Sequence, residues 1–126
     1  MAINVLVVDD SAMARKMIVR VLHMAGLPLG TVGEAGDGVD GLAQLEAAEH
    51  DLAILDINMP RMNGLDLLAR IRGVARLRSL PVLMVSTEGS DVRVERVKEL
   101  GAGFLRKPFA PEDLVEAVVE AIGGAS

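Results

Sequence analysis

The sequence predicts an α/β fold in which a five-stranded parallel sheet has helices on both faces. Two observations support this prediction. Five short apolar runs alternate along the chain with longer segments whose apolar residues recur every three or four positions. The first run, VLVV at residues 5–8, is apolar without interruption, as expected of a strand buried on both faces. Strands that alternate with helices form parallel sheets between two helical layers.

The first half of the chain predicts three strands and the helices between them. From Met13 the apolar residues recur with helical spacing, and Gly26 is a helix stop that Pro28 follows closely. A weaker strand and a helix come next, and then a third strand that ends in aspartate. Their ranges are 31–35, 37–50 and 51–56.

The second half continues the alternation. INMPRMNG, at residues 57–64, predicts a loop in which Asn63 caps the following helix. Pro111 stands in the first turn of the last predicted helix, where its missing N–H costs nothing. The remaining elements are a strand at 81–86, a helix at about 90–100, a strand at 103–107 and a helix at 110–122.

Length and composition limit the possible functions. We expect 126 residues to form one domain. A net charge of −5 and an aromatic content of 2% argue against a nucleic-acid partner. The chain has no cysteine, which excludes disulfides and thiolate metal sites and fits a reducing compartment. No apolar run approaches the ~18 residues of a membrane span, and no secretion signal is visible. We therefore expect a cytoplasmic protein without membrane insertion.

Polar side chains stand where four of the predicted strands end. The carboxyl ends of parallel strands meet at one edge of the sheet, so these side chains are expected to surround one pocket. The second strand ends in Ala35-Gly36 and offers no such group, which predicts that it is an outer strand. The polar groups are Asp9 and Asp10 after the first strand, Asp56 after the third, Ser86 after the fourth and Lys107 after the fifth.

This set of side chains favours phosphoryl chemistry. Three neighbouring carboxylates repel one another and must protonate or bind a cation. Oxygen ligands without a nearby histidine or cysteine favour Mg²⁺ or a similar hard ion. Together with Lys107, such an ion offsets the three negative charges, so that the pocket could accept a phosphoryl group. One carboxylate could then act as the nucleophile, and Ser86 could donate a hydrogen bond to the product.

At these residues the chain resembles the receiver domain of two-component response regulators, over essentially its whole length. The resemblance rests on VVDD, LDINMPRMNGLDLL, PVLMVS and KPF in that order, and EAGDGVDGL and NMP make it closest to the single-domain chemotaxis regulators. It implies a flavodoxin-like (βα)5 fold with strand order 2-1-3-4-5. It also implies that residues 1–126 form a single receiver domain without an output domain. The protein is then a signalling switch and not an enzyme, one that assists its own aspartyl phosphorylation and slow dephosphorylation.

The resemblance implies a role for each acidic residue. Asp56 is the phosphoacceptor. Asp10 and Asp56 bind Mg²⁺ directly, together with the main-chain carbonyl of Asn58. Asp9 helps to position the ion through water.

The resemblance also implies how phosphorylation is read out. Lys107 contacts the phosphoryl oxygens, and its bond to Pro108 is expected to be cis, as an X-Pro bond permits. Ser86 is the hydroxyl that moves toward the phosphate, and Phe104 is the ring that turns into the vacated space. The face formed by the fourth strand and the fourth and fifth helices then changes shape, and a partner that binds the altered face shifts the population.

The chain departs from the family pattern at two places. Thr87 follows Ser86 where the family usually has alanine or glycine, so a bulkier side chain would stand over the pocket. Thr87 is also a rival candidate for the switch hydroxyl. Ser86 is favoured because the number of residues from Ser86 to Gly101 fits the family pattern without a gap. The loop after Gly101 is one residue shorter than the family pattern. Two further residues are expected near the pocket mouth, Met59 and Glu88, the latter more simply as a solvated loop carboxylate.

Three alternatives belong to other classes. A haloacid-dehalogenase-type phosphatase needs a second aspartate two residues after the nucleophile, where this chain has Asn58. A flavin mononucleotide carrier needs a phosphate-binding loop after the first strand, where Asp9 and Asp10 would repel the phosphate. The third is a receiver-like interaction module that acts without phosphorylation, and metal-dependent phosphorylation would distinguish it.

Partners follow from the resemblance. The expected phosphoryl donor is a sensor histidine kinase or a phosphotransfer protein. The expected target is a flagellar motor switch, a kinase or the next component of a relay. We expect the chain to act as a monomer.

Overall fold

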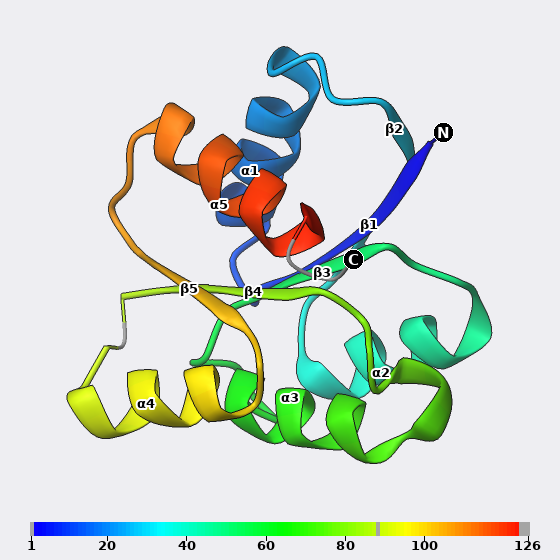
Figure 1. Cartoon of the computed structure of the whole chain (residues 1–126), viewed down its shortest axis with the longest axis vertical. Coiled ribbons are helices and arrows are strands. Elements are labelled where there is room, and N and C mark those ends of the chain that lie inside the picture. The colour runs from blue at the N-terminus through cyan, green and yellow to red at the C-terminus, as the bar shows by residue number, and fades with distance from the viewer. Residues whose placement is uncertain (1, 88, 124–126) are drawn as a thin grey trace.

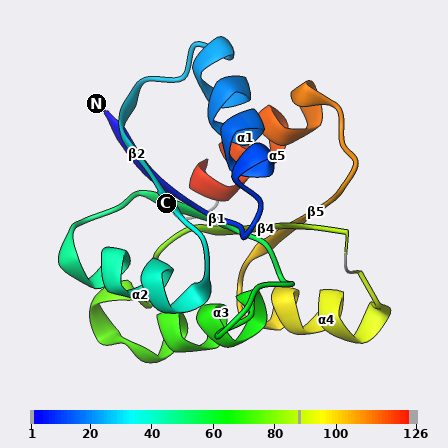
Figure 2. The ribbon, with the colours of Figure 1, turned by 180° about the vertical axis from the view of Figure 1, so that it is seen from behind.

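The computed structural model describes residues 2–87 and 89–123, and it confirms the predicted fold class. Five parallel strands form one sheet in the order β2-β1-β3-β4-β5 (Figure 1). Helices α1 and α5 cover one face of the sheet, while α2, α3 and α4 cover the other, as the view from behind also shows (Figure 2). The elements are β1 Ile3–Val8, α1 Ala12–Met24, β2 Leu29–Ala35, α2 Gly38–Ala47, β3 Leu52–Leu55, α3 Gly64–Gly73, a 3₁₀ turn Ala75–Leu77, β4 Val82–Ser86, α4 Asp91–Glu99, β5 Gly103–Arg106 and α5 Pro111–Gly123.

The strand register brings the strand ends to one level. Val8, the last residue of β1, pairs with Leu55, the last residue of β3. The next residues, Asp9 and Asp56, therefore leave the sheet side by side, and the N–H of Asp56 still donates to the carbonyl of Val8 at 2.9 Å. The outer position of β2, beside β1 alone, agrees with the prediction from its apolar ending.

Apolar side chains fill the space on both faces of the sheet. Along β1 they alternate: Val5 and Val7 pack with residues of α1 and α5, while Leu6 and Val8 pack with residues of α2 and α3. Each fully buried aliphatic side chain contributes roughly 1.5–3 kcal/mol of transfer free energy. These two clusters fix the strands, and so they fix the polar residues at the strand ends.

Side chains cap the helices that border the carboxyl edge of the sheet. The hydroxyl of Ser11 accepts from the N–H of Ala14 at 3.1 Å, which explains why α1 begins at Ala12, one residue before the predicted start. Asn63 accepts from the N–H of Asp66 at 2.8 Å, as predicted. Gly26, the predicted stop of α1, has a φ of 75°, a conformation that glycine adopts readily.

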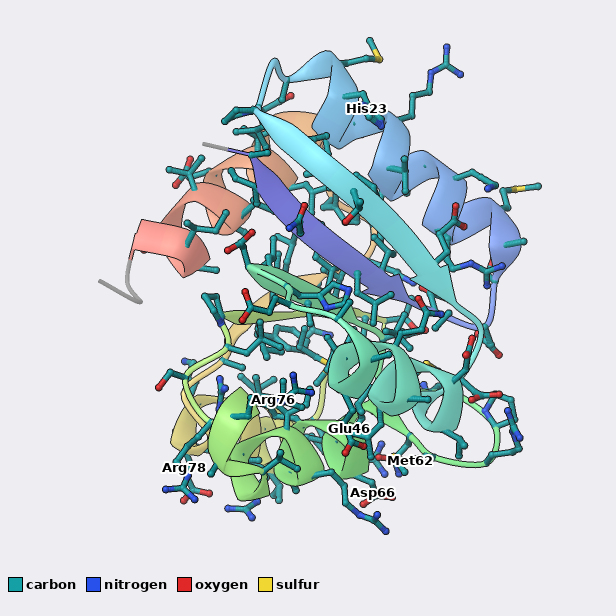
Figure 3. The ribbon with its side chains drawn as sticks, turned by 90° about the vertical axis from the view of Figure 1, so that its right-hand side faces the viewer. His23, Glu46, Met62, Asp66, Arg76 and Arg78 are labelled. Carbon is teal, nitrogen blue, oxygen red and sulfur yellow. The ribbon has the colours of Figure 1, made fainter. Side chains whose placement is uncertain are left out.

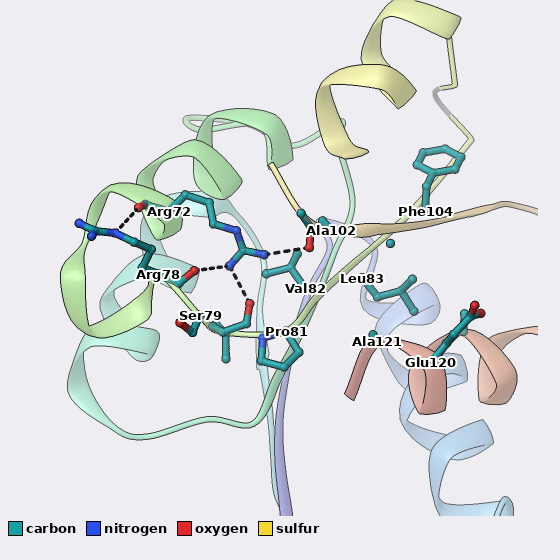
Figure 4. A pocket seen from close by; sticks show the side chains of 14 residues that line it. Arg72, Arg78, Ser79, Pro81, Val82, Leu83, Ala102, Phe104, Glu120 and Ala121 are labelled. Carbon is teal, nitrogen blue, oxygen red and sulfur yellow. Dashed lines mark hydrogen bonds between the residues drawn. The ribbon is translucent and has the colours of Figure 1, made fainter. Parts of the chain in front are cut away.

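Arg72 joins the loops at the opposite, amino edge of the sheet, an arrangement that the sequence did not indicate. Its guanidinium donates to the carbonyls of Leu80 at 2.7 Å, Arg78 at 3.1 Å and Gly101 at 3.3 Å (Figure 4). It also donates to the carbonyl of Leu100 at 2.6 Å. A cavity of about 610 Å³ lies beside it, between the amino ends of β4 and β5 and helix α5. The side chain of Arg72 thus links the loops that precede the amino-terminal ends of β4 and β5.

A second arginine links the helices on the same side of the sheet. Arg76, in the 3₁₀ turn, donates to the carbonyl of Glu46 in α2 (Figure 3).

Among the described residues, no helix combines the length and apolar character that crossing a membrane would require.

Candidate functional site

Three carboxylates gather at the carboxyl edge of the sheet. Oxygen atoms of Asp9, Asp10 and Asp56 all lie within 4.8 Å of one another. Asp9 is 2% exposed and Asp56 is 9% exposed, whereas Asp10 is open to solvent. Parallel strands that end at one edge predict that these side chains meet, and the structure does bring them together.

Asp9 is the most constrained of the three carboxylates. Its Oδ1 accepts from the N–H of Ser11 at 2.9 Å, and its Oδ2 accepts from the Nζ of Lys107 at 2.7 Å. Its main-chain carbonyl accepts from Nη1 of Arg15 at 2.6 Å, while the Nε of Arg15 is bonded to Glu34 at 3.0 Å. These contacts hold the Asp9-Asp10 turn in place from both sides.

Lys107 reaches into this cluster from the end of β5. Its Nζ lies 2.7 Å from Oδ2 of Asp9 and 3.7 Å from Oδ2 of Asp56. Its backbone N–H donates to the carbonyl of Ser86 at 3.0 Å, and its bond to Pro108 is cis, as predicted. One ammonium group lies beside two of the three carboxylates, so the cluster keeps an excess of negative charge.

Asp56 sits where α3 approaches the sheet most closely. Its Oδ1 accepts from the N–H of Ile57 at 2.7 Å, which leaves Oδ2 directed at Lys107. A Cβ on Gly64 would lie 1.9 Å from the carbonyl oxygen of Asp56, so only glycine fits at the start of α3. The position of the adjoining Asn63 predicts a helix cap but not this requirement for glycine, for which the Asn-Gly pair was the available signal.

The two candidate switch residues lie on neighbouring strands. Ser86 is fully buried at the end of β4, whereas the adjoining Thr87 is exposed. Phe104, on β5, is half-buried and packs against the apolar cluster on the α4 side of the sheet (Figure 4). It pairs with Met84, two residues before Ser86, and the guanidinium of Arg106 lies 6.0 Å from the centre of its ring. Ser86 and the ring are thus close along the strands without being direct partners in register.

Two of the remaining predicted residues belong to the β3–α3 loop, residues 56–63. Asn58 is exposed, while Met59 is half-buried and packs at the edge of the core. Glu88 lies outside the described residues.

The donor set fits a hard divalent cation. Three carboxylates offer only oxygen ligands, and one lysine does not balance their charge. A cation coordinated by Asp10 and Asp56 would relieve their mutual repulsion. A phosphoryl group bound beside it would then meet positive charge from the ion and from Lys107.

An α/β sheet of this order with an acidic cluster and a lysine at its carboxyl edge is the architecture of a particular signalling family. The response regulator receiver domain model matches residues 5–119. Chemotaxis protein CheY1 of Helicobacter pylori is 37% identical over 122 residues, which cover 95% of this chain and 97% of that protein. This chain belongs to the response regulator receiver domain family.

Solved structures of receiver domains agree with this assignment to the family. The chemotaxis protein CheY4 of Vibrio cholerae is 36% identical with a TM-score of 0.85, and the match covers 96% of this chain and 99% of that one. A chain of the CheX–CheY–BeF₃–Mg²⁺ complex from Borrelia burgdorferi is 26% identical with a TM-score of 0.86, covering 94% and 87%. Receiver domains are signalling switches of two-component systems that bind Mg²⁺ in an acidic pocket, and they are not enzymes in the ordinary sense.

Proposed function

We propose that this chain is a phosphorylation switch that takes a phosphoryl group from a histidine kinase or a phosphotransfer histidine onto Asp56, in a Mg²⁺-dependent reaction. The observation that carries the proposal is the meeting of Asp9, Asp10 and Asp56 with Lys107 at one strand edge. Asp10, Asp56 and the carbonyl of Asn58 would hold the ion, which supplies positive charge to the phosphoryl oxygens. Asp9 would act on the ion through water.

The side-chain geometry supports a specific nucleophile. Oδ1 of Asp56 is engaged by the N–H of Ile57, so Oδ2 is the oxygen directed toward Lys107. Oδ2 would attack the phosphorus of a phosphohistidine. The new O–P bond forms while the P–N bond breaks, and the imidazole leaves with its electron pair. Lys107, already 3.7 Å from Oδ2, would follow the transferred oxygens. Water would later attack the phosphorus and regenerate the carboxylate.

The readout would begin at the end of β4. The hydroxyl of Ser86 would move toward the phosphoryl group, and Phe104 would turn into the space that it leaves. Phe104 stands on β5, which contacts α4, so the surface of β4, α4 and α5 would change shape and recruit a partner of a chemotaxis or other two-component pathway. The candidate targets are a flagellar motor switch, a kinase or a relay component.

Intact mass measurement tests the proposal. The chain is incubated with acetyl phosphate, with and without Mg²⁺, as wild type, Asp56→Asn and the control Asp66→Asn, which alters an exposed aspartate on α3. We expect a Mg²⁺-dependent gain of one phosphoryl group in the wild type and the control and none in Asp56→Asn.

A second arm addresses Thr87. If the wild type gains nothing, Thr87→Ala should relieve a block to small donors, and a phosphorylated histidine kinase supplies a donor of the expected class. If neither reaction labels a folded chain, the switch is refuted and an interaction module that acts without phosphorylation replaces it.

A further inference from the structure

The β3–α3 loop contains a strained turn. The N–H of Met62 donates to the carbonyl of Pro60 at 2.7 Å, and Arg61 between them has a φ of 64°. A three-residue turn with a positive φ at its centre is rare, and a side chain there adds to the strain. Among the described residues, Arg61 is the one non-glycine residue with positive φ. Such strain persists where the surrounding structure enforces it, and it gathers at functional sites.

The side chain of Arg61 meets a carboxylate of a different segment. Its Nε and Nη2 lie 2.9 Å and 2.6 Å from Oδ2 of Asp37, the residue before α2. The other oxygen of Asp37 caps α2 by accepting from the N–H of Asp40 at 2.9 Å. Hydrogen bonds from that N–H and from Arg61 hold the pKa of Asp37 below its ordinary value, so the ion pair extends to a more acidic pH than an ordinary aspartate would allow.

The backbones of the two segments also touch. The N–H of Gly38 donates to the carbonyl of Met62 at 3.2 Å, and a Cβ on Gly38 would lie 2.6 Å from that oxygen. Met62 accordingly lies beside α2 (Figure 3). The loop is therefore docked against the start of α2 by an ion pair and by a hydrogen bond that tolerates no side chain at Gly38.

The other end of the loop is fixed at the acidic site. The N–H of Gly64 donates to the carbonyl of Ile57 at 2.8 Å, next to Asp56. Asn58 and Met59 lie between this bond and the turn at Arg61. The geometry points to a positioning role: we propose that the Arg61–Asp37 ion pair holds the β3–α3 loop in the strained shape that presents the carbonyl of Asn58 to the divalent cation. This inference rests on the proposed function, because it assumes the metal site at Asp10 and Asp56.

Two substitutions with opposite changes in charge distinguish a positioning role of the ion pair from a purely Coulombic effect on the metal. Arg61→Gln removes a positive charge and by Coulomb attraction alone would strengthen Mg²⁺ binding, whereas Asp37→Asn removes a negative charge and would weaken it. Asparagine still caps α2. If the ion pair positions the loop, both substitutions weaken Mg²⁺ binding, and the double variant is no worse than the more affected single variant.

The measurement is Mg²⁺ affinity by calorimetry, without a phosphoryl donor, combined with amide hydrogen exchange. We expect losses of about threefold to tenfold, below the roughly tenfold to hundredfold effect of groups bonded directly to metal ligands. The amides of Met62 and Gly38 should lose protection in both variants. Arg70→Gln and Glu46→Gln are matched controls, since they make the same charge changes on exposed side chains of α3 and α2.

The outcomes are distinguishable. A wild type that binds Mg²⁺, with Arg61→Gln binding it as tightly or more tightly, overturns the positioning role and leaves the proposed function intact. Unchanged protection of Met62 and Gly38 in both variants also overturns it. A folded wild type that binds no Mg²⁺ at any concentration overturns the metal site and this inference together. Parallel losses of affinity and protection in both single variants support it.

Discussion

The Nζ of Lys107 lies closer to Asp9, at 2.7 Å, than to Asp56, at 3.7 Å. The ammonium group thus shares the acidic pocket with any cation that binds there. Two positive charges in one pocket repel each other, while both attract the oxygens of a phosphoryl group. The same lysine should therefore oppose metal binding and favour phosphoryl transfer.

Lys107→Met, which keeps most of the unbranched stem and removes the charge, should change these two properties in opposite directions. We expect Mg²⁺ affinity to rise by about tenfold, from the loss of a repulsion of roughly 1–2 kcal/mol at a dielectric constant close to that of water. Phosphorylation by acetyl phosphate should fall by about a hundredfold or more. Calorimetry and intact mass measure the two effects. Lys98→Met, on the exposed side of α4, should alter neither; a fall in both properties would contradict the shared-pocket argument.

Gly64→Ala should damage the fold and the site together. The added Cβ would stand 1.9 Å from the carbonyl oxygen of Asp56, so α3 or Asp56 must move. We expect a loss of about 3 kcal/mol or more in the free energy of unfolding. Gly73→Ala, at the other end of α3, meets nothing within 4 Å and should stabilise the helix by up to about 1 kcal/mol. Urea unfolding of both variants checks this, and equal effects would refute the close approach.

Arg72 should be a strong determinant of stability away from the acidic site. Burial lowers the pKa of its guanidinium, yet four carbonyls accept its hydrogen bonds and keep it satisfied. Arg72→Met keeps the apolar stem and should cost about 2–3 kcal/mol, because four carbonyls, two of them in part-buried bonds, lose a charged donor. Lysine has one donor group and should recover less than half of that loss. Full recovery by Arg72→Lys in urea unfolding would show that charge alone matters there.

Glu34 should contribute to the acid sensitivity of the fold. The hydrogen bond from Lys16, then the one from Arg15, lower its pKa in the folded state below the ordinary 4.5. A carboxyl with a lowered folded pKa adds stability above its unfolded pKa, and that stability is lost as the pH falls through the folded value. From pH 6 down to pH 3, Glu34→Gln should therefore lose less stability than the wild type, by urea midpoints. Parallel curves for the two proteins would exclude the contribution of Glu34.

The strand ends were predictable because one geometric rule governs them. Apolar runs mark the strands, and parallel strands send their carboxyl ends to the same edge, so Asp9, Asp56 and Lys107 had to converge. The order of the strands was implied by family resemblance, since periodicity alone does not say which strand is central. The short 3₁₀ turn at 75–77 was not predicted, because three residues show no period.

Contacts between distant segments could not be predicted in the same way. The pair formed by Arg61 and Asp37 joins residues 24 positions apart, and the bond from Arg72 to Leu100 joins residues 28 apart. Neither spacing belongs to a helix or a strand, so only the packed fold reveals them. Gly64 is similar: its sequence fits a helix start, but the reason for glycine is the carbonyl of Asp56 above it.

The ion pair between Lys107 and Asp9 also bears on how the protein is made. Its partners are 98 residues apart, one at the end of the first strand and one at the end of the last. During synthesis, the three carboxylates emerge well before the lysine that faces them. A growing chain that has not yet docked β5 beside β4 lacks this charge, and so it is expected to be a poor phosphoryl acceptor. The ability to accept a phosphoryl group is thus expected only after the last strand has docked, when the other four strands are already in place.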